Sequence, residues 1–213
     1  MEISPRLKNI LEWAYCILIA IGLALLFRYY IGTPTVVKMS SMKNTLIEGD
    51  RLILSRIKRG KAKTYKRGDI ITFEAPSNSN PSAIDLNNEN PKALYKNNPQ
   101  GFFEKFSYYV LEFGKTSYIK RVIGIAGDHV KIENGKVYLN EQELDEPYLL
   151  EQNSTESKKL TDIIVPEGYV FAMGDNRKNS TDCREFGCIP VSKIESKVVM
   201  RFWPLNKFGK IEK

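Results

Sequence analysis

Ser41, in the stretch Val36 to Leu46, is the first candidate for covalent chemistry in this chain, because a serine hydroxyl can act as a nucleophile. A serine hydroxyl is a poor nucleophile until a neighbouring base takes its proton. Histidine is the usual base, but the 213 residues include a single histidine, His129. The base must therefore be His129, a lysine or a carboxylate, and the rest of the sequence has to decide between them.

Ser41 follows a long apolar run, Ile10 to Ile31, at a distance of ten residues. Ten extended residues reach at most roughly 35 Å, so Ser41 would work close to a bilayer if the run spans one. The uninterrupted part, Trp13 to Phe27, is shorter than the roughly 20 residues that a span needs. Flanking aromatic residues and a snorkelling Arg28 can supply the missing length.

Two other interpretations of the run stay open. A cleaved signal peptide is disfavoured, because no small-x-small cleavage site follows Phe27. A buried helix of a soluble protein is the plainer alternative, since apolar residues occur on every face. The charges do not show which end of the run would face the cytoplasm, because basic residues flank it on both sides.

The composition favours a folded domain behind one anchor. Hydrophobic residues make up 42% and charged residues 27% of the chain, which is typical of a globular domain. The net charge of +7 suits an anionic membrane surface, and no nucleic-acid motif accompanies it. No metal or cofactor motif is present, so we expect neither a metal site nor a cofactor.

Short alternating runs predict a mostly β domain of about eight strands with little helix beyond the anchor. The Asn134-Gly135 step between two such runs is a strong hairpin signal. The predicted strands are 52–54, 69–73, 118–125, 130–132, 136–139, 165–173 and 197–203.

Three connecting segments are less regular. Residues 56–67 hold seven basic residues and no acidic one, which fits a solvated loop or a loop that contacts headgroups. Residues 76–100 are rich in Asn, Ser and Pro and predict an exposed loop. Residues 102–113 are aromatic and predict a short helix or strand on the body, or a piece that dips into the membrane.

Cys183 and Cys188 flank a four-residue segment that contains Gly187. The spacing is not that of a zinc site, because no second cysteine pair or histidine cluster exists. A disulfide across this turn is expected if the domain lies outside the cytoplasm, and a pair of reduced thiols is the alternative. Cys16 lies in the apolar run and is interpreted as a small packing residue.

Three blocks stand out behind the anchor: Ser41-Met42 with Thr45-Leu46, the stretch Tyr118 to Asp128, and the stretch Gly174 to Gly187. Together and in this order they resemble type I signal peptidase, the membrane-bound Ser/Lys serine protease of peptidase family S26, in its compact Gram-positive-like form. The resemblance extends over nearly the whole chain, and the third block is its most specific part.

The resemblance implies that Ser41 is the nucleophile and Lys120 the general base. To accept a proton Lys120 must be neutral, whereas a free lysine has a pKa of about 10.4. Burial disfavours the ammonium and lowers that value. In an alternating strand Tyr118, Lys120 and Val122 share one face and Arg121 points the other way.

The resemblance also assigns supporting roles in the third block. Ser180 would hydrogen-bond the Lys120 amine, and Asp182 with Arg184 would form a polar brace for this segment. An ion pair between Asp182 and Arg184 is equally the ordinary structural interpretation. Asp175 and Arg177 are interpreted as residues that fix a turn.

The chain departs from the family pattern at four places. Asn44 stands where proline is usual, and Cys183 where serine is common. Met39 stands where some members carry a serine that helps to stabilise the oxyanion, so the backbone N–H of Ser41 should be the main donor. The stretch 76–117 is a long insertion compared with compact members.

The resemblance implies a serine endopeptidase that removes signal peptides from secretory preproteins with small residues at −1 and −3. Residues 1–32 would be a short cytoplasmic end and the transmembrane anchor. Residues 33–213 would be the catalytic domain on the extracytoplasmic side of a single-pass cell-membrane protein. The expected partners are preproteins and the lipid bilayer, with no nucleic acid.

Three rival interpretations remain. A triad of Ser41, His129 and an aspartate stays open, although His129 follows a turn aspartate and is better interpreted as a surface residue. A Ser/Lys self-cleaving regulator shares the chemistry, but it would carry a DNA-binding module where the apolar run stands. A non-catalytic membrane-anchored homologue is disfavoured by the intact Ser41 and Lys120.

Overall fold

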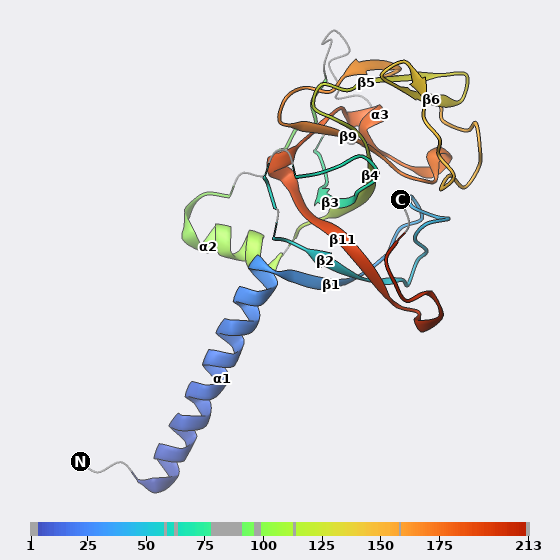
Figure 1. The fold of residues 1–213 in the computed structure, drawn as a ribbon. Helices are drawn as coiled ribbons and strands as arrows, with labels where there is room; N and C mark the ends of the chain where they lie inside the picture. Colours follow the sequence, from blue (N-terminus) through green and yellow to red (C-terminus); the bar gives the residue numbers. More distant parts are fainter. Residues whose placement is uncertain are drawn as a thin grey trace.

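The structure, a computed structural model, describes residues 4–57, 59–61, 64–77, 91–95, 99–112, 114–157 and 159–211. A long N-terminal helix projects from a β-rich body (Figure 1). The strands are β1 (Gly32–Val36), β2 (Arg51–Ser55), β3 (Ile70–Glu74), β4 (Ser117–Ile125), β5 (His129–Glu133), β6 (Lys136–Leu139), β7 (Gln142–Glu143), β8 (Asp162–Ile164), β9 (Tyr169–Met173), β10 (Ile189–Pro190) and β11 (Ile194–Trp203). The α-helices are α1 (Pro5–Tyr30), α2 (Gly101–Phe106) and α3 (Cys183–Phe186), and shorter helical turns are η2 (Ser107–Leu111), η3 (Arg177–Asn179), η4 (Val191–Lys193) and η5 (Leu205–Lys207).

The helix α1 begins with two signals in the sequence: the Ser4 hydroxyl accepts a hydrogen bond from the backbone N–H of Leu7, and Pro5 occupies the first turn. None of its 26 residues is buried, so the alternative of a soluble core helix is wrong. Among the described residues α1 is the one helix long and apolar enough to cross a membrane, with a length of about 39 Å.

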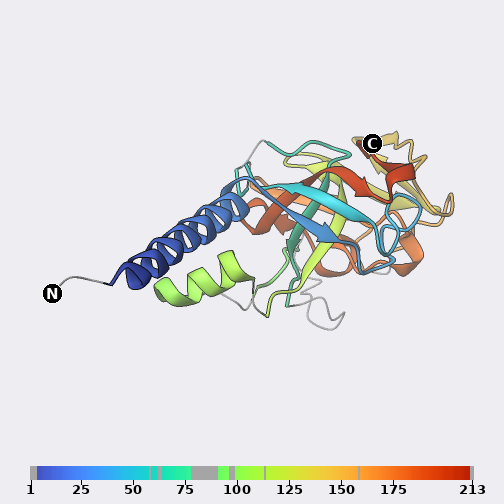
Figure 2. The same cartoon turned by 90° about the horizontal axis from the view of Figure 1, so that it is seen from below.

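One residue separates α1 from β1, so the helix is joined closely to the sheet. The connection requires glycine at position 32, because a Cβ there would lie 2.2 Å from the carbonyl oxygen of Leu54 in the neighbouring strand. β1 pairs antiparallel with β2 from this first residue onward. The end of α1 is therefore held against the body (Figure 2).

The body contains two antiparallel sheets, which confirms the predicted mostly β fold. The larger sheet has the order β1-β2-β11-β3-β4-β9-β10, and the smaller one the order β7-β6-β5-β8. The predicted Asn134-Gly135 hairpin joins β5 and β6. Eleven strands form in the described part of the chain, where about eight were expected. The strands β1, β7, β8 and β10 lie outside the seven predicted ranges, because they lack a run of alternating apolar residues.

Two predicted segments differ from the structure in detail. The strand expected over 165–173 begins at Tyr169, because Pro166 and Gly168 form a turn before it. The aromatic segment 102–113 is helical, as α2 and η2. Most of the loop expected over 76–100, and Lys58, Ala62 and Lys63 of the basic loop, lie outside the described residues.

Two apolar clusters form the core. The larger lies around β3, β4 and β9 and extends to β5 and β6. The smaller one includes Val37, Met42 and Leu46 together with residues of β2, β3 and β11. Val37, four residues before Ser41, and Met42, directly after it, are thus anchored in this smaller core, and they fix where the Ser41 hydroxyl lies.

Candidate active site

Ser41 lies on a tight turn between β1 and β2. Met42 and Leu46 are fully buried, and backbone hydrogen bonds from Lys43 to Ser40 at 3.0 Å and from Leu46 to Met42 at 2.8 Å close the turn. Ser41 itself is 7% exposed. The apolar spacing of the stretch therefore serves to present one hydroxyl at the edge of the smaller core.

Lys120 reaches Ser41 from the middle of β4, with its Nζ donating to Ser41 Oγ at 2.7 Å. β4 is covered on both faces, so Lys120 is 1% exposed although it carries an amine. Burial lowers the pKa of Lys120 from its ordinary value of 10.5 to about 8, and the negative charge of Asp182 opposes that shift. The two residues that the sequence singled out as a dyad are within hydrogen-bond reach of each other.

The alternation predicted for this strand is confirmed by the partners of Arg121. Its guanidinium forms two hydrogen bonds with the carboxylate of Asp175, at 2.9 and 2.8 Å, and both side chains are fully buried. Lys120 and Arg121 are adjacent, yet one contacts Ser41 and the other contacts Asp175. The positive neighbour is thus neutralised by its own partner.

The third block, from Gly174 onward, packs directly on the Ser41 turn. A Cβ at Gly174 would lie 2.3 Å from Ser180 Oγ and 2.5 Å from the carbonyl oxygen of Ser41, so this close approach needs glycine. Asp182 accepts from the backbone N–H of Gly174 at 3.0 Å, and its carboxylate pairs with Arg184 at 2.8 Å. The predicted Asp182–Arg184 brace is present, and both side chains are buried.

The expected hydrogen bond from Ser180 to Lys120 is absent among the hydrogen bonds of the described residues. Ser180 Oγ donates instead to Asp182 Oδ2 at 2.7 Å. The prediction of that bond is wrong in this structure because the Asp182 carboxylate is a stronger acceptor than an amine and lies two residues away. Ser180 still lines the cavity that holds Ser41 and Lys120.

Asn176 is a positioning residue that sequence reasoning missed. Its backbone N–H donates to the carbonyl of Ser41 at 3.0 Å, and its side-chain amide donates to the carbonyl of Ser40 at 3.1 Å. Asn179 donates from its side chain to Ser40 Oγ at 2.8 Å. Ser40, the neighbouring serine, therefore has its hydroxyl bonded to the third block, and Ser41 is the serine that contacts the Lys120 amine.

The structure accounts for two departures from the family pattern, at Asn44 and at Met39. Asn44 has φ of +93°, a conformation closed to proline, and its side chain donates to the carbonyls of Tyr148 and Leu149, each at 3.1 Å. The turn after Ser41 is held by this amide in place of a proline ring. Among the described residues no hydrogen bond uses the backbone N–H of Ser41, so this donor is available as an oxyanion donor.

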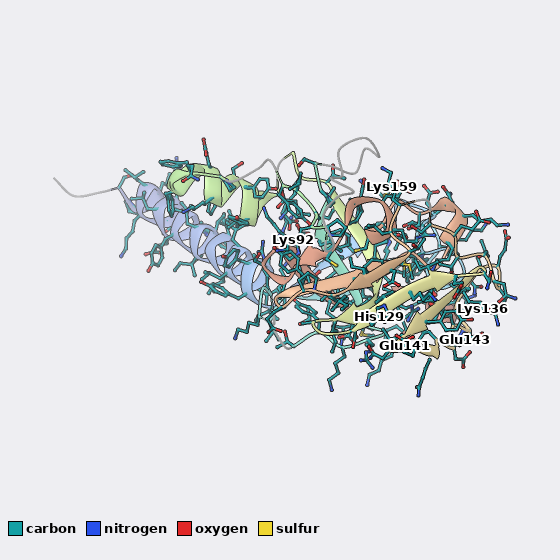
Figure 3. All side chains as sticks on the ribbon, turned by 90° about the horizontal axis from the view of Figure 1, so that it is seen from above. Lys92, His129, Lys136, Glu141, Glu143 and Lys159 are labelled. Carbon is teal, nitrogen blue, oxygen red and sulfur yellow. The ribbon has the colours of Figure 1, made fainter. Side chains whose placement is uncertain are left out.

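His129 is remote from this site. It lies at the start of β5 in the smaller sheet, beside Glu141 and away from α1 (Figure 3). Its ring nitrogens contact carboxylates of Glu141 and Asp162, each at 2.6 Å, which raises the pKa of His129. The interpretation as a satisfied surface histidine is confirmed, and the alternative triad is wrong.

The disulfide expected between Cys183 and Cys188 is also wrong, because both cysteines are free and buried. The segment between them begins as the helical turn α3 and not as a hairpin. Ala172 of β9 donates its backbone N–H to the Cys183 sulfur at 3.1 Å. Burial raises the pKa of both thiols, which keeps them protonated.

Two cavities meet at Ser41. The first, of about 620 Å³, extends from Ser41 along β1 and the first residues of β4 to η2. The second, of about 470 Å³, contains Ser41, Lys120 and Ser180. β1 is an edge strand, and residues 117–119 of β4 pair only with β3, so both strands offer a free edge toward the first cavity. Such edges suit an extended peptide.

No metal-binding cluster of three or more His, Cys, Asp or Glu occurs in the part of the chain that the structure describes. The groups that the structure places at Ser41 are its own hydroxyl, the Lys120 amine and the surrounding backbone.

Comparison with known proteins identifies relatives across the whole chain. The family model described as signal peptidase, peptidase S26, matches residues 10–203. Signal peptidase I of Bacillus licheniformis is 33% identical over 221 residues, covering 99% of this chain and 98% of that protein. The probable signal peptidase I-1 of a Synechocystis strain is 31% identical over 200 residues, covering 92% and 83%. A crystal structure of a signal peptidase I from Enterococcus faecalis shares 25% identity with a TM-score of 0.40, covering 64% of this chain and 98% of that one.

Proposed function

Because this chain belongs to the signal peptidase family, peptidase S26, we propose that it removes signal peptides from secretory preproteins with a dyad of Ser41 and Lys120. The observation that carries the dyad is the 2.7 Å contact between Lys120 Nζ and Ser41 Oγ, made inside a buried pocket. The chain is accordingly a serine endopeptidase, with a preprotein as substrate.

The first chemical step follows from the protonation of Lys120. In the deprotonated enzyme the contact with Ser41 reverses, so that the hydroxyl donates to the amine lone pair. Lys120 takes the proton as Ser41 Oγ attacks the scissile carbonyl. The new oxyanion faces the backbone N–H of Ser41, which makes no hydrogen bond among the described residues. Lys120 then gives its proton to the leaving amine, and an acyl-enzyme remains on Ser41.

The second step uses the same amine. Lys120, neutral again, removes a proton from a water molecule that attacks the ester at Ser41. This hydrolysis releases the signal peptide from Ser41. Ser180, Asp182 and Arg184 support the dyad. The Asp182 carboxylate accepts hydrogen bonds from the backbone N–H of Gly174, the hydroxyl of Ser180 and the guanidinium of Arg184, so it holds the third block together beside Ser41.

The substrate would lie extended in the cavity between β1 and β4. Its backbone would pair with the free strand edges, while apolar lining residues such as Val37 and Ile119 accept small side chains. This arrangement supports a preference for small residues at −1 and −3, because the buried side chain of Met42 bounds the cavity beside Ser41.

We place α1 across the cell membrane, within an anchor of residues 1–32, and the domain 33–213 on the extracytoplasmic side. The exposed apolar surface of α1, whose most hydrophobic window has a mean hydropathy of 2.3, supports the anchor. The proposed substrate supports the extracytoplasmic placement of this domain, because signal peptides are removed after export. Cytoplasmic accessibility of residues before α1, and protease accessibility of the domain from outside intact cells, test the topology.

The decisive experiment compares cleavage of a model preprotein by the wild type, Ser41→Ala, Lys120→Met and His129→Ala. We expect the first two variants to lose cleavage while they keep the thermal unfolding profile of a folded protein, because dyad members act as a unit. His129→Ala should cleave like the wild type. Turnover by either dyad variant near the wild-type rate would disprove the assignment.

A further inference from the structure

The helical segment Gly101–Leu111, made of α2 and η2 and here called the insert helix, exposes aromatic side chains. Phe102 is 76% exposed, and Phe103 is 85% exposed, more than any other large hydrophobic side chain among the described residues. Phe106 stacks on Phe102, with ring centroids 6.3 Å apart. A gathering of exposed aromatic rings in one place marks an interaction surface.

The insert helix is fastened to the end of α1. Glu112, the residue that follows it, pairs with Arg28 in the last turn of α1 at 2.9 Å, and also with buried Arg56. η2 contacts α1 directly. The exposed rings therefore belong to a segment whose other end lies beside the last turn of the proposed anchor.

Aromatic and cationic side chains surround this junction. The Arg59 guanidinium lies over the ring of Tyr29 in α1, at 5.7 Å, and over the ring of Tyr109 in η2, at 5.3 Å. The amine of Lys115 lies over the ring of Tyr108 at 4.8 Å. Tyrosines with lysines and arginines are typical of the headgroup level of a bilayer. If α1 spans the membrane as proposed above, this junction lies at that level.

The insert helix leaves the junction sideways. In Figure 1 α2 runs across the direction of α1 at the upper end of that helix, and Figure 2 shows it beside α1 from a second direction. A helix at this place lies along the plane of a bilayer that α1 crosses. At 100° per residue, Phe102, Phe103 and Phe106 share one side, whereas Glu104 lies on the other.

We propose that the insert helix is an interfacial membrane helix, with Phe102, Phe103 and Phe106 inserted in the leaflet that holds the C-terminal end of α1. Helices of this kind lie about 5–10 Å into the boundary between headgroups and acyl chains. The occupant is lipid because the segment contacts the end of α1, the one candidate span among the described residues, and the ion pair of Arg28 and Glu112 holds the two together. The inference rests on the proposed anchoring.

The function of this second attachment follows from the cavity beside it. Leu111 and Glu112, at the end of the insert helix, line the same cavity as Ser41. One helix leaves the body free to rotate about its axis, whereas two separate attachments fix the direction of the cavity. A cleavage site that leaves the membrane would then meet Ser41 without a search over orientations.

Tryptophan fluorescence tests the insertion in the full-length protein reconstituted in phosphatidylcholine vesicles. The chain has two tryptophans, Trp13 and Trp203. In a background of Trp13→Phe and Trp203→Phe, Phe103→Trp places the probe on the insert helix. The matched control is Ile164→Trp in the same background, on an exposed position of β8 in the smaller sheet. Both proteins must keep the thermal unfolding midpoint of the background.

We expect brominated acyl chains to quench the Phe103→Trp probe and aqueous acrylamide to leave it largely unquenched, with the reverse for Ile164→Trp. Quenching of both probes by acrylamide alone would overturn the proposal. Protection of the Phe103→Trp probe from both quenchers would also overturn it and would indicate a protein surface over the helix. A variant that keeps Trp13 as its only tryptophan tests the α1 anchor separately from the insert helix. If brominated lipid does not quench Trp13, the proposed anchoring itself is refuted.

Discussion

Cleavage by this enzyme should rise with pH and level off above about pH 8, since Lys120 must lose its proton before it can act as a base. With a pKa of about 8, the amine is neutral in about one molecule in ten at pH 7 and in about nine of ten at pH 9. A lysine that kept the ordinary 10.5 would be neutral in only about one molecule in 3,000 at pH 7. Burial of this one side chain thus raises the fraction of enzyme with a neutral Lys120 at pH 7 by about 300-fold.

The assay is kcat/KM for an internally quenched peptide that carries a signal-peptide cleavage site, measured between pH 6 and 10. We expect the logarithm of kcat/KM to rise with a slope of one below the pKa of Lys120 and then to become flat. His129→Ala should give the same profile. A rate that still climbs at pH 10 would refute the buried amine, and a midpoint that moves in His129→Ala would refute the choice of base.

The same shift affects folding, in a defined direction. Between pH 8 and 10.5 the unfolded chain keeps the proton of Lys120 while the folded chain has lost it, so stability rises with pH across this window. The rise amounts to about 3 kcal/mol and is absent below pH 8, where both states are protonated. We therefore expect the difference in the free energy of unfolding between the wild type and Lys120→Met to change across this pH window and to be constant below it. Urea unfolding in detergent measures this difference.

Three further expectations follow from the site. Ser180→Ala removes a hydrogen bond to the Asp182 carboxylate, worth about 1.5–3 kcal/mol. We expect it to lower the thermal unfolding midpoint and to leave the midpoint of the pH–rate profile unchanged. A shifted pH–rate profile would instead reveal a hydrogen bond between Ser180 and the Lys120 amine. Asn176→Ala loses one hydrogen bond to the turn that contains Ser41, so we expect kcat to fall by about fivefold with little change in KM. An unchanged kcat would contradict the positioning role of Asn176. Cys183 and Cys188 should both react with a maleimide in unfolded protein that was never reduced, and intact-mass analysis would detect any disulfide.

The parts of the fold that the sequence predicted are those where one local signal dominates. Asn134-Gly135 fixes a hairpin by turn chemistry alone. The alternation of β4 correctly sends Lys120 and Arg121 to opposite sides, because period two is a property of any strand. The short strands β7 and β10 have two residues each, too few for a periodic signal.

The details that sequence reasoning missed depend on competition between neighbours in space. Ser180 had two candidate acceptors, and the choice of Asp182 depends on where α3 holds that carboxylate. The cysteine spacing was compatible with a turn, but a helical turn after Asp182 takes Cys183 toward the backbone of Ala172. The amide of Asn176 had no periodic or charge signal, so only its contacts in the fold reveal it.

The distribution of charge in the third block explains how buried Lys120 stays without an ion pair among the described residues, although Asp175 and Asp182 act on its pKa. Asp175 is held by Arg121, and Asp182 by Arg184, each through a buried ion pair. Among the described residues Lys120 has no carboxylate within ion-pair distance, although Asp182 is close enough to raise its pKa. If either carboxylate lost its arginine, it would stabilise the ammonium of Lys120 and take the base out of the working range. We therefore expect the two arginines to keep the pKa of Lys120 low, by occupying the acids that Lys120 would otherwise bind.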